Sequence, residues 1–134
     1  MTTPALDYAA LPVDPDEGFP QSFRLSLGDR IYQVTLYVNV SERLLDATPP
    51  DAVLELPQEE AFMVLRVQRE SDVAEPATIL QRKVVPGLAY EAEEVALRFT
   101  EMRVARRNVN GVGPHGSSVK GGVALRWSSS SGTS

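Results

Sequence analysis

The segment from Phe19 to Val40 most constrains the fold, because its apolar residues recur at every second position in two runs around Gly28-Asp29. Period-two spacing suits a half-buried strand, since successive side chains point to opposite faces of a sheet. Gly28 can adopt the positive φ that the first central position of a type II′ turn requires. The segment therefore predicts a β-hairpin. The alternating residues are Phe23, Leu25 and Leu27 in the first run and Tyr32, Val34, Leu36, Val38 and Val40 in the second.

Composition excludes several classes of protein. The chain has 134 residues, a net charge of −5, no cysteine and one histidine. This length suits a single domain, which commonly has on the order of 100–150 residues. Disulfides and the usual zinc ligand sets are excluded. The negative charge argues against a broad nucleic-acid surface, and no apolar run reaches the roughly 20 residues of a membrane helix. We therefore expect neither nucleic acid nor membrane as a partner.

The chain divides into an extended N-terminal arm over residues 1–20, a single β-domain over 21–127 and a disordered tail over 128–134. Four prolines in the arm disfavour both a helix and a central strand. Its apolar side chains nevertheless predict contact with a neighbouring subunit, and a disordered terminus is the alternative. The apolar arm residues are Leu6, Tyr8, Leu11 and Val13.

The rest of the β-domain shows further strand and turn signals. Residues 61–69 alternate with apolar side chains on both faces, which predicts a covered strand. Residues 41–57, which contain three prolines, are interpreted as a connector. Pro86-Gly87 suits a type II turn that ends the strand over 78–85. The fold class is therefore mainly β, a small barrel or sandwich of about six strands.

The segment 88–107 has two interpretations. As a helix, it places its apolar residues on one stripe, with acidic residues near the start and arginines near the end. As a strand, its apolar residues alternate in two phases that a bulge near Thr100 would join. The helix leaves Leu97 and Val104 off its stripe. We favour the bulged strand, paired with residues 123–127, and keep the helix as an α+β alternative.

The glycine-rich segment from Asn108 to Gly122 is interpreted as a mobile loop without catalytic chemistry. A nucleotide-binding loop needs a lysine directly after its last glycine, where this chain has Ser117. His115 has no recognisable orienting carboxylate and nucleophile beside it. The acidic residues Glu91, Glu93 and Glu94 match neither a calcium-binding loop nor a glycosidase pair. We expect no catalytic, cofactor-binding or metal-binding residues.

A group of arginines stands out against the acidic background. Charges segregated by sign favour complementary docking between proteins and steer their encounter. The alternative is an ordinary solvated strand edge. We therefore predict a partner contact at Arg98, Arg103, Arg106 and Arg107.

The hairpin also carries a family resemblance. Its residues resemble the opening of short phage tail proteins, namely the baseplate plug and minor tail proteins of long-tailed phages. A later turn is similar to one found further along in such proteins. The resemblance implies a small, mainly-β virion component without catalytic residues. It is carried by Phe19-Pro20-Gln21-Ser22-Phe23, Leu25, Leu27-Gly28-Asp29, Tyr32 and Leu36-Tyr37, and by Val84-Val85-Pro86-Gly87 in the later turn.

These observations predict a structural subunit of a phage tail tip or baseplate, made in the host cytoplasm and located in the virion. It would assemble with other tail proteins and with copies of itself. The alternative is a free-standing module that recognises a peptide or sugar through the loop from Asn108 to Gly122. A small hydrolase that uses His115 ranks last.

Overall fold

The computed structural model describes residues 8–71 and 73–125 and is mainly β, as predicted. One short α-helix, α1 (Glu42–Ala47), and two 3₁₀ turns, η1 (Pro15–Glu17) and η2 (Arg106–Asn108), accompany the strands. The described residues form nine strands: β1 (Ala9–Ala10), β2 (Gln21–Leu27), β3 (Arg30–Val40), β4 (Val53–Glu55), β5 (Ala61–Arg69), β6 (Ala77–Lys83), β7 (Ala89–Ala92), β8 (Val95–Ala105) and β9 (Ser118–Leu125).

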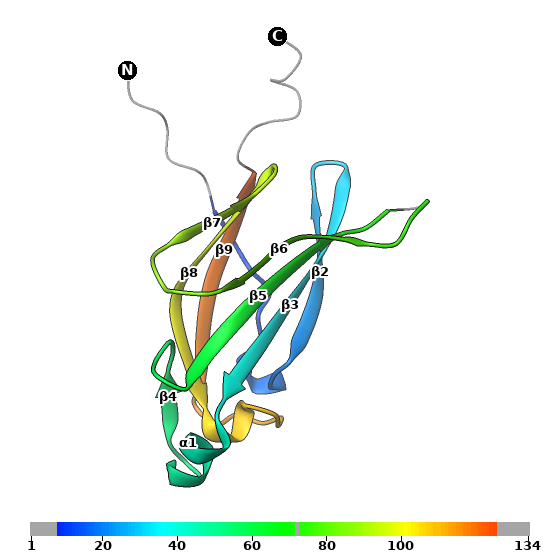
Figure 1. Ribbon diagram of the computed structural model, residues 1–134. Helices are drawn as coiled ribbons and strands as arrows, with labels where there is room; N and C mark the ends of the chain where they lie inside the picture. The colour runs from blue at the N-terminus through cyan, green and yellow to red at the C-terminus, as the bar shows by residue number, and fades with distance from the viewer. Residues whose placement is uncertain (1–7, 72, 126–134) are drawn as a thin grey trace, which may run out of the picture.

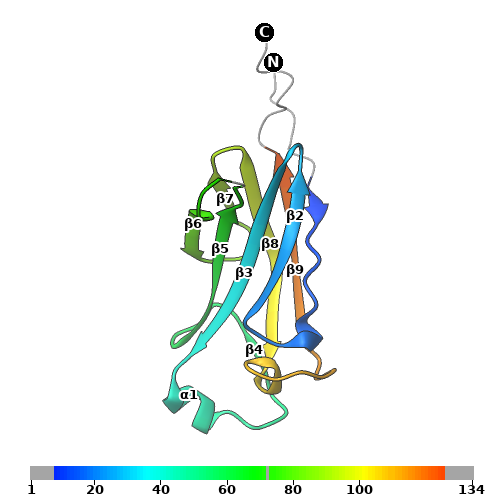
Figure 2. The ribbon, with the colours of Figure 1, turned by 90° about the vertical axis from the view of Figure 1, so that its right-hand side faces the viewer.

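The strands form two antiparallel sheets that lie side by side as layers (Figure 1). One sheet has the order β2-β3-β5-β6. The other has the order β1-β9-β8-β4, with β7 paired to the upper part of β8. Figure 2 shows the four-stranded sheet face on, with β8 and β9 behind it. The arrangement is a sandwich-like pair of sheets and not a closed barrel.

The hairpin predicted around Gly28 is present as β2 and β3, joined in register from Gln21↔Leu36 to Leu27↔Arg30. Gly28 has φ +62°, so the turn uses the backbone freedom that glycine supplies. Leu36 is fully buried, and its neighbour on the adjacent strand is Leu65, which is equally buried. The period-two pattern therefore marks the inward face of the sheet correctly.

Residues 88–107 are strands, and the helical alternative is wrong. β7 and β8 form a hairpin, and β8 pairs with β9. The register shifts between Phe99 and Glu101, so the bulge lies at Thr100 as the change of phase predicted. Because of this extra residue, Phe99 and Met102 both point into the core although their spacing is odd. Sheet pairing buries Leu97 and Val104, the two residues that a helix would have left off its apolar stripe.

The last strand starts earlier than the sequence indicated. β9 begins at Ser118, so part of the segment read as a loop belongs to the sheet. Gly121 lies opposite Phe99, and a Cβ there would stand 2.7 Å from the Phe99 ring. The aromatic ring thus occupies the space that a side chain would fill, which explains how a glycine-rich stretch becomes a strand. Trp127 lies outside the described residues.

The boundary predicted at residue 20 does not separate an arm from the domain. β1 pairs with β9, and the Leu11 amide donates to the Gly121 carbonyl at 2.9 Å. Leu11 is 8% exposed and Phe19 3%, and both belong to the core. The described part of the arm crosses from one sheet to the other along the β2–β9 side (Figure 2). Prolines prevented a long strand here, but they did not prevent burial of the apolar side chains.

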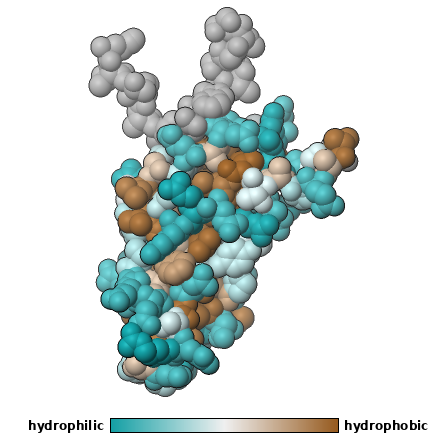
Figure 3. Space-filling view, in the orientation of Figure 1, coloured by the Kyte–Doolittle hydropathy of each residue, from teal (hydrophilic) through white to brown (hydrophobic). Residues whose placement is uncertain are grey.

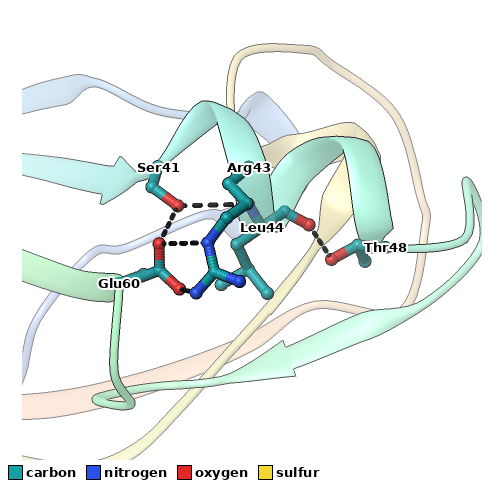
Figure 4. A network of polar contacts seen from close by, with 5 residues as sticks. All are labelled: Ser41, Arg43, Leu44, Thr48 and Glu60. Carbon is teal, nitrogen blue, oxygen red and sulfur yellow. Dashed lines mark hydrogen bonds and ion pairs between the residues drawn. The ribbon is translucent and has the colours of Figure 1, made fainter.

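The predicted connector 41–57 contains α1 and β4. Ser41 caps the helix by accepting from the Leu44 amide at 3.1 Å, and it donates to Glu60 at 2.8 Å (Figure 4). Arg43 pairs with the same carboxylate, and together these partners hold the pKa of Glu60 below its ordinary value. The turn before β5 and the start of α1 are therefore tied at one end of the sandwich.

Replacement of Leu36 by alanine is expected to lower the free energy of unfolding by about 2–5 kcal/mol, because a buried leucine leaves a cavity. The matched control is Leu88→Ala, since Leu88 is 53% exposed. That change should cost about 0.5 kcal/mol or less. Urea denaturation of both variants checks the difference. Equal midpoints would show that the inward face of β3 is assigned wrongly.

Candidate contact surfaces

Arg98 and Arg103 lie on the outer face of the five-stranded sheet, and both are exposed. Arg98 pairs in register with Gly122, and Arg103 pairs with Ser118 and Glu55. Their spacing of five residues would put them on opposite faces of a regular strand. The bulge at Thr100 restores them to the same face.

This basic pair surrounds a carboxylate. Glu101 accepts a hydrogen bond from the Ser118 hydroxyl at 2.7 Å, and Lys120 approaches it to 3.7 Å. The hydrogen bond from Ser118 is the main cause that holds the pKa of Glu101 below its ordinary value; partial burial opposes the shift, and Lys120 and Arg103 add to it. The charge on this face is therefore mixed rather than purely basic.

Arg106 and Arg107 do not join that face. The Arg106 side chain donates through Nε to the Leu45 carbonyl at 3.0 Å, and its amide donates to the Ala52 carbonyl at 2.9 Å. Arg106, the first residue of η2, thus ties the segment after β8 to α1 and to the residue before β4. Arg107 is exposed and lines a shallow hollow of about 220 Å³ together with His115. The four predicted arginines occupy three different environments.

The apolar residues of the predicted arm contact also lie in different environments. Leu11 is in the chain's own core, and Val13 packs against that core half-buried. Tyr8 is half-buried on the outer face, where a Cβ at Gly122 would stand 2.8 Å from its own Cβ. Leu6 lies outside the described residues. A neighbouring subunit is therefore not needed to shield Leu11 or Val13 from water.

The glycine-rich loop is held by one buried side chain, a contact that its composition did not indicate. Asn108 is 0% exposed and donates to the carbonyls of Gly111 and Gly113, each at 3.1 Å. Ser117 donates to Asn108 Oδ1 at 2.6 Å and accepts from the Ala105 amide at the same distance. The composition of the loop indicated flexibility because sequence does not show where an asparagine turns inward.

The loop also packs on the start of the chain. The Gly113 amide donates to the Asp16 carbonyl at 2.7 Å, and the Phe19 amide donates to the Asn108 carbonyl at 3.1 Å. Gly18 has φ +78°, and a Cβ there would stand 2.1 Å from the Gly111 oxygen. Any other residue at position 18 would force the two segments apart.

A third surface was not recognised from the sequence as a contact. The outer face of β3, β5 and β6 carries an aromatic face, defined as Tyr37, Phe62, Val64, Arg66 and Lys83. Tyr37, Val64 and Lys83 lie opposite one another in one row across the sheet. Arg66 donates to the Tyr37 hydroxyl at 3.2 Å, and the Lys83 ammonium stands 4.8 Å from the centre of the Phe62 ring. Each cation is held against an aromatic group.

The aromatic face is basic on an acidic chain. No carboxylate lies in the row of cross-strand neighbours that contains Tyr37. The neighbouring row, through Thr35, Arg66 and Gln81, has none either. Arg66 Nε is buried and has no hydrogen-bond partner among the described residues. The signal was present in the sequence, because Phe62, Val64 and Arg66 alternate with the core residues of the same strand. This alternation was interpreted only as a sign that both faces of the strand are covered, and not as a contact surface.

Apolar side chains are also exposed on the β6–β7 side of the molecule. Figure 3 shows several separate apolar areas there among hydrophilic ones. Leu88 and Val85, in the connection between the two strands, are 53% and 38% exposed. Scattered apolar residues of this kind are usual on a protein surface. The aromatic face is therefore the stronger candidate for a contact.

Comparisons with protein-family models, with curated proteins and with solved structures found no match. Among residues 8–71 and 73–125, no group of three or more histidine, cysteine, aspartate or glutamate side chains is arranged to hold a metal ion. No helix in that part of the chain is long and apolar enough to span a membrane.

The Glu101 carboxyl should titrate below its ordinary value of 4.5. A carboxyl with a lowered folded pKa stabilises the fold above its unfolded pKa, and this contribution is lost as the pH falls through the folded value. Ser118→Ala should raise the midpoint towards 4.5, because the main hydrogen bond is removed. Side-chain carboxyl NMR measures the midpoint, and Ser26→Ala is the control. An unchanged midpoint in Ser118→Ala would contradict the assignment.

Replacement of Asn108 by aspartate should destabilise the fold by at least about 1–3 kcal/mol, since two donors are lost and a charge is buried against carbonyl oxygens. Asn110 is exposed, so Asn110→Asp is the matched control. Denaturation and amide exchange of residues 109–117 test both variants. Equal stability of the two variants would mean that the Asn108 side chain does not hold the loop.

Proposed function

We propose that the chain is a structural subunit of a phage tail tip or baseplate and acts by protein–protein assembly in the virion. Its partners would be other tail proteins and copies of itself. The resemblance of the hairpin residues to short phage tail proteins supports this proposal, and these residues build β2 and the first part of β3. The proposal assigns no catalytic role to His115 or to any other residue.

The observation that carries the proposal is the aromatic face. Aromatic residues and arginine are enriched in protein interfaces, where they contribute much of the binding energy. Tyr37, Phe62 and Arg66 are already half-buried, with Arg66 bonded to the Tyr37 hydroxyl and Lys83 over the Phe62 ring. A partner would therefore meet a preorganised surface, which reduces the entropy lost on binding. The positive charge of Arg66 and Lys83 favours an acidic partner surface.

The two lysines of the chain allow a direct test, because they lie on the outer faces of opposite sheets. Lys83 belongs to the aromatic face, and Lys120 lies beside Glu101. Both are exposed, so both should react with an acylating reagent in the free chain. In purified tail particles of the phage that encodes the chain, Lys83 should be protected several-fold and Lys120 should not. Mass spectrometry of the labelled peptides gives both values from one sample.

Absence of the chain from such particles would contradict the proposed function. Protection of Lys120 instead of Lys83 would agree with the proposed function but would show that the contact lies on the other sheet. A paired charge reversal extends the test: Lys83→Glu should slow assembly and change its salt dependence, whereas Lys120→Glu should not. Both positions are exposed, so neither change should prevent folding.

A second candidate function is a binding module that takes a peptide or sugar at the glycine-rich loop. The observation that favours it is the ordered loop beside the hollow between Arg107 and His115, since a rigid loop positions binding groups well. Only residues 109–117 form the loop, because β9 begins at Ser118. Loss of ligand binding in Asn108→Asp, with binding retained in Lys83→Glu, would favour this candidate.

A further inference from the structure

The four-stranded sheet has two edge strands, β2 and β6, and β6 carries features that hinder a further strand from pairing with it. The register of β6 shifts beside Val67 and Gln68, so this edge contains a bulge, and Arg82 and Lys83 add two charges. Bulges and charged side chains are common protections of a sheet edge. At the edges of the other sheet lie β1, β4 and β7, which have two, three and four residues. Such short strands protect an edge in another way.

β2 has none of these protections. It has seven residues, it pairs with β3 in unbroken register, and Arg24 is its one charged residue. Two hydrogen bonds, at 2.8 and 2.9 Å, join the Arg24 side chain to Glu70, which follows β5. Figure 2 shows β2 at the margin of its sheet. β2 is therefore a long and regular sheet edge whose single charge is neutralised.

The even-numbered residues of β2 direct their backbone groups away from the sheet. The hairpin has a two-residue turn, so Leu27 and Arg30 form a hydrogen-bonded pair, and the odd-numbered residues of β2 bond to β3. The Glu70 amide donates to the Ile31 carbonyl at 2.9 Å, which agrees with this alternation because odd-numbered residues of β3 then bond towards β5. The backbone amides and carbonyls that face the free edge have no partner among the described residues; they belong to Ser22, Arg24 and Ser26.

The apolar side chains of β2 are also incompletely covered. Phe23, Leu25 and Leu27 pack against the core but stay half-buried. Val34 and Leu36, on the neighbouring β3, are fully buried. A strand added at the edge of β2 would cover the half-buried row with its own inward side chains. The edge thus offers main-chain hydrogen bonds and an apolar row to the same occupant.

We propose that β2 pairs with β2 of a second copy of the chain, antiparallel and about a two-fold axis, so that two four-stranded sheets become one. β2 suits itself as a partner, because it brings unpaired backbone groups on one side and apolar side chains at alternate positions. A two-fold contact is closed, so no β2 edge is left open. The inference rests on the proposed function, which names copies of the chain as partners, and adds a contact distinct from the aromatic face.

Charge and hydrogen bonding select one register among the three axes near the middle of β2. Even-numbered residues must lie opposite even-numbered residues, since only these have free backbone groups. An axis at Arg24 would place the two arginines opposite each other, which is unfavourable. An axis at Phe23 would require an amide from Pro20, which has none. The remaining axis passes through Leu25.

In this register Arg24 of each copy lies opposite Ser26 of the other, and Phe23 lies opposite Leu27. Like charges are avoided, and apolar side chains meet along the whole inner row. The two copies nevertheless repel each other as a whole, because each has a net charge of −5. Salt screens this repulsion, so the β2 contact should strengthen with salt. A contact driven by the cations of the aromatic face should weaken instead.

The test is sedimentation equilibrium of the purified full chain over a range of concentrations and at low and high ionic strength. A dimer is expected, and salt should favour it. Amide exchange of the concentrated chain should be slowed several-fold at Arg24 and Ser26. The control is the amide of Gln81, an exposed residue on the edge formed by β6, and its exchange should stay unchanged.

Charge variants test the register. Ser26→Glu would face Arg24 of the other copy at two places and should tighten the dimer, although it makes the net charge more negative. Ser26→Lys should weaken the dimer, and we expect the two dissociation constants to differ about tenfold. Thr78→Glu and Thr78→Lys, at an exposed position of β6, change the net charge equally and are the controls.

A chain that stays monomeric at every concentration would overturn the inference. Equal affinities of Ser26→Glu and Ser26→Lys, or slowed exchange at Gln81 in place of Ser26, would do the same. None of these results would decide the proposed function, because protection of Lys83 in tail particles does not depend on β2. A β2 dimer of a chain that is absent from such particles would support the inference and contradict the proposed function.

Discussion

The packing of the two inner sheet faces against each other is the interaction on which the rest of the structure depends. Leu36 and Leu65 from one sheet and Leu97 and Phe99 from the other belong to a single cluster of fully buried side chains. Apolar burial on this scale is the main term that stabilises a domain of this size. Because the core lies between the two inner faces, both outer faces are free to carry other chemistry.

The bulge at Thr100 connects this core to the surface. It allows β8 to bury Phe99 and Met102 in succession, and the same extra residue brings Arg98, Glu101 and Arg103 to the outside. One residue therefore sets both what packs inside and what is charged outside. Bulges often have this effect of redirecting side chains.

The sequence predicted the elements whose signals are local. The alternation in 21–40 and 61–69 gave the hairpin and the third main strand, and the change of phase in 95–105 gave the bulge. It did not predict β1 or β4, because strands of two or three residues have no period of their own. It also missed the partners of Arg106 and Asn108, since those depend on which distant carbonyls the fold brings near. The charge pattern singled out Arg98 and Arg103, whose contact with a partner stays a prediction. It did not indicate the aromatic face, whose members come from three separate strands.

The short pairing of β1 with β9 has a mechanical consequence. Tyr8 and Leu125 lie at the same end of this antiparallel pair, since Ala9 is opposite Val123. Tension applied between these two positions would load the hydrogen bonds one after another, as in opening a zipper, and would not shear them together. The start of the chain would therefore peel from β9 as far as Leu11, whose side chain is anchored in the core, while the register of the other strands stays intact. A segment paired in this way detaches under tension while the rest of the domain stays folded.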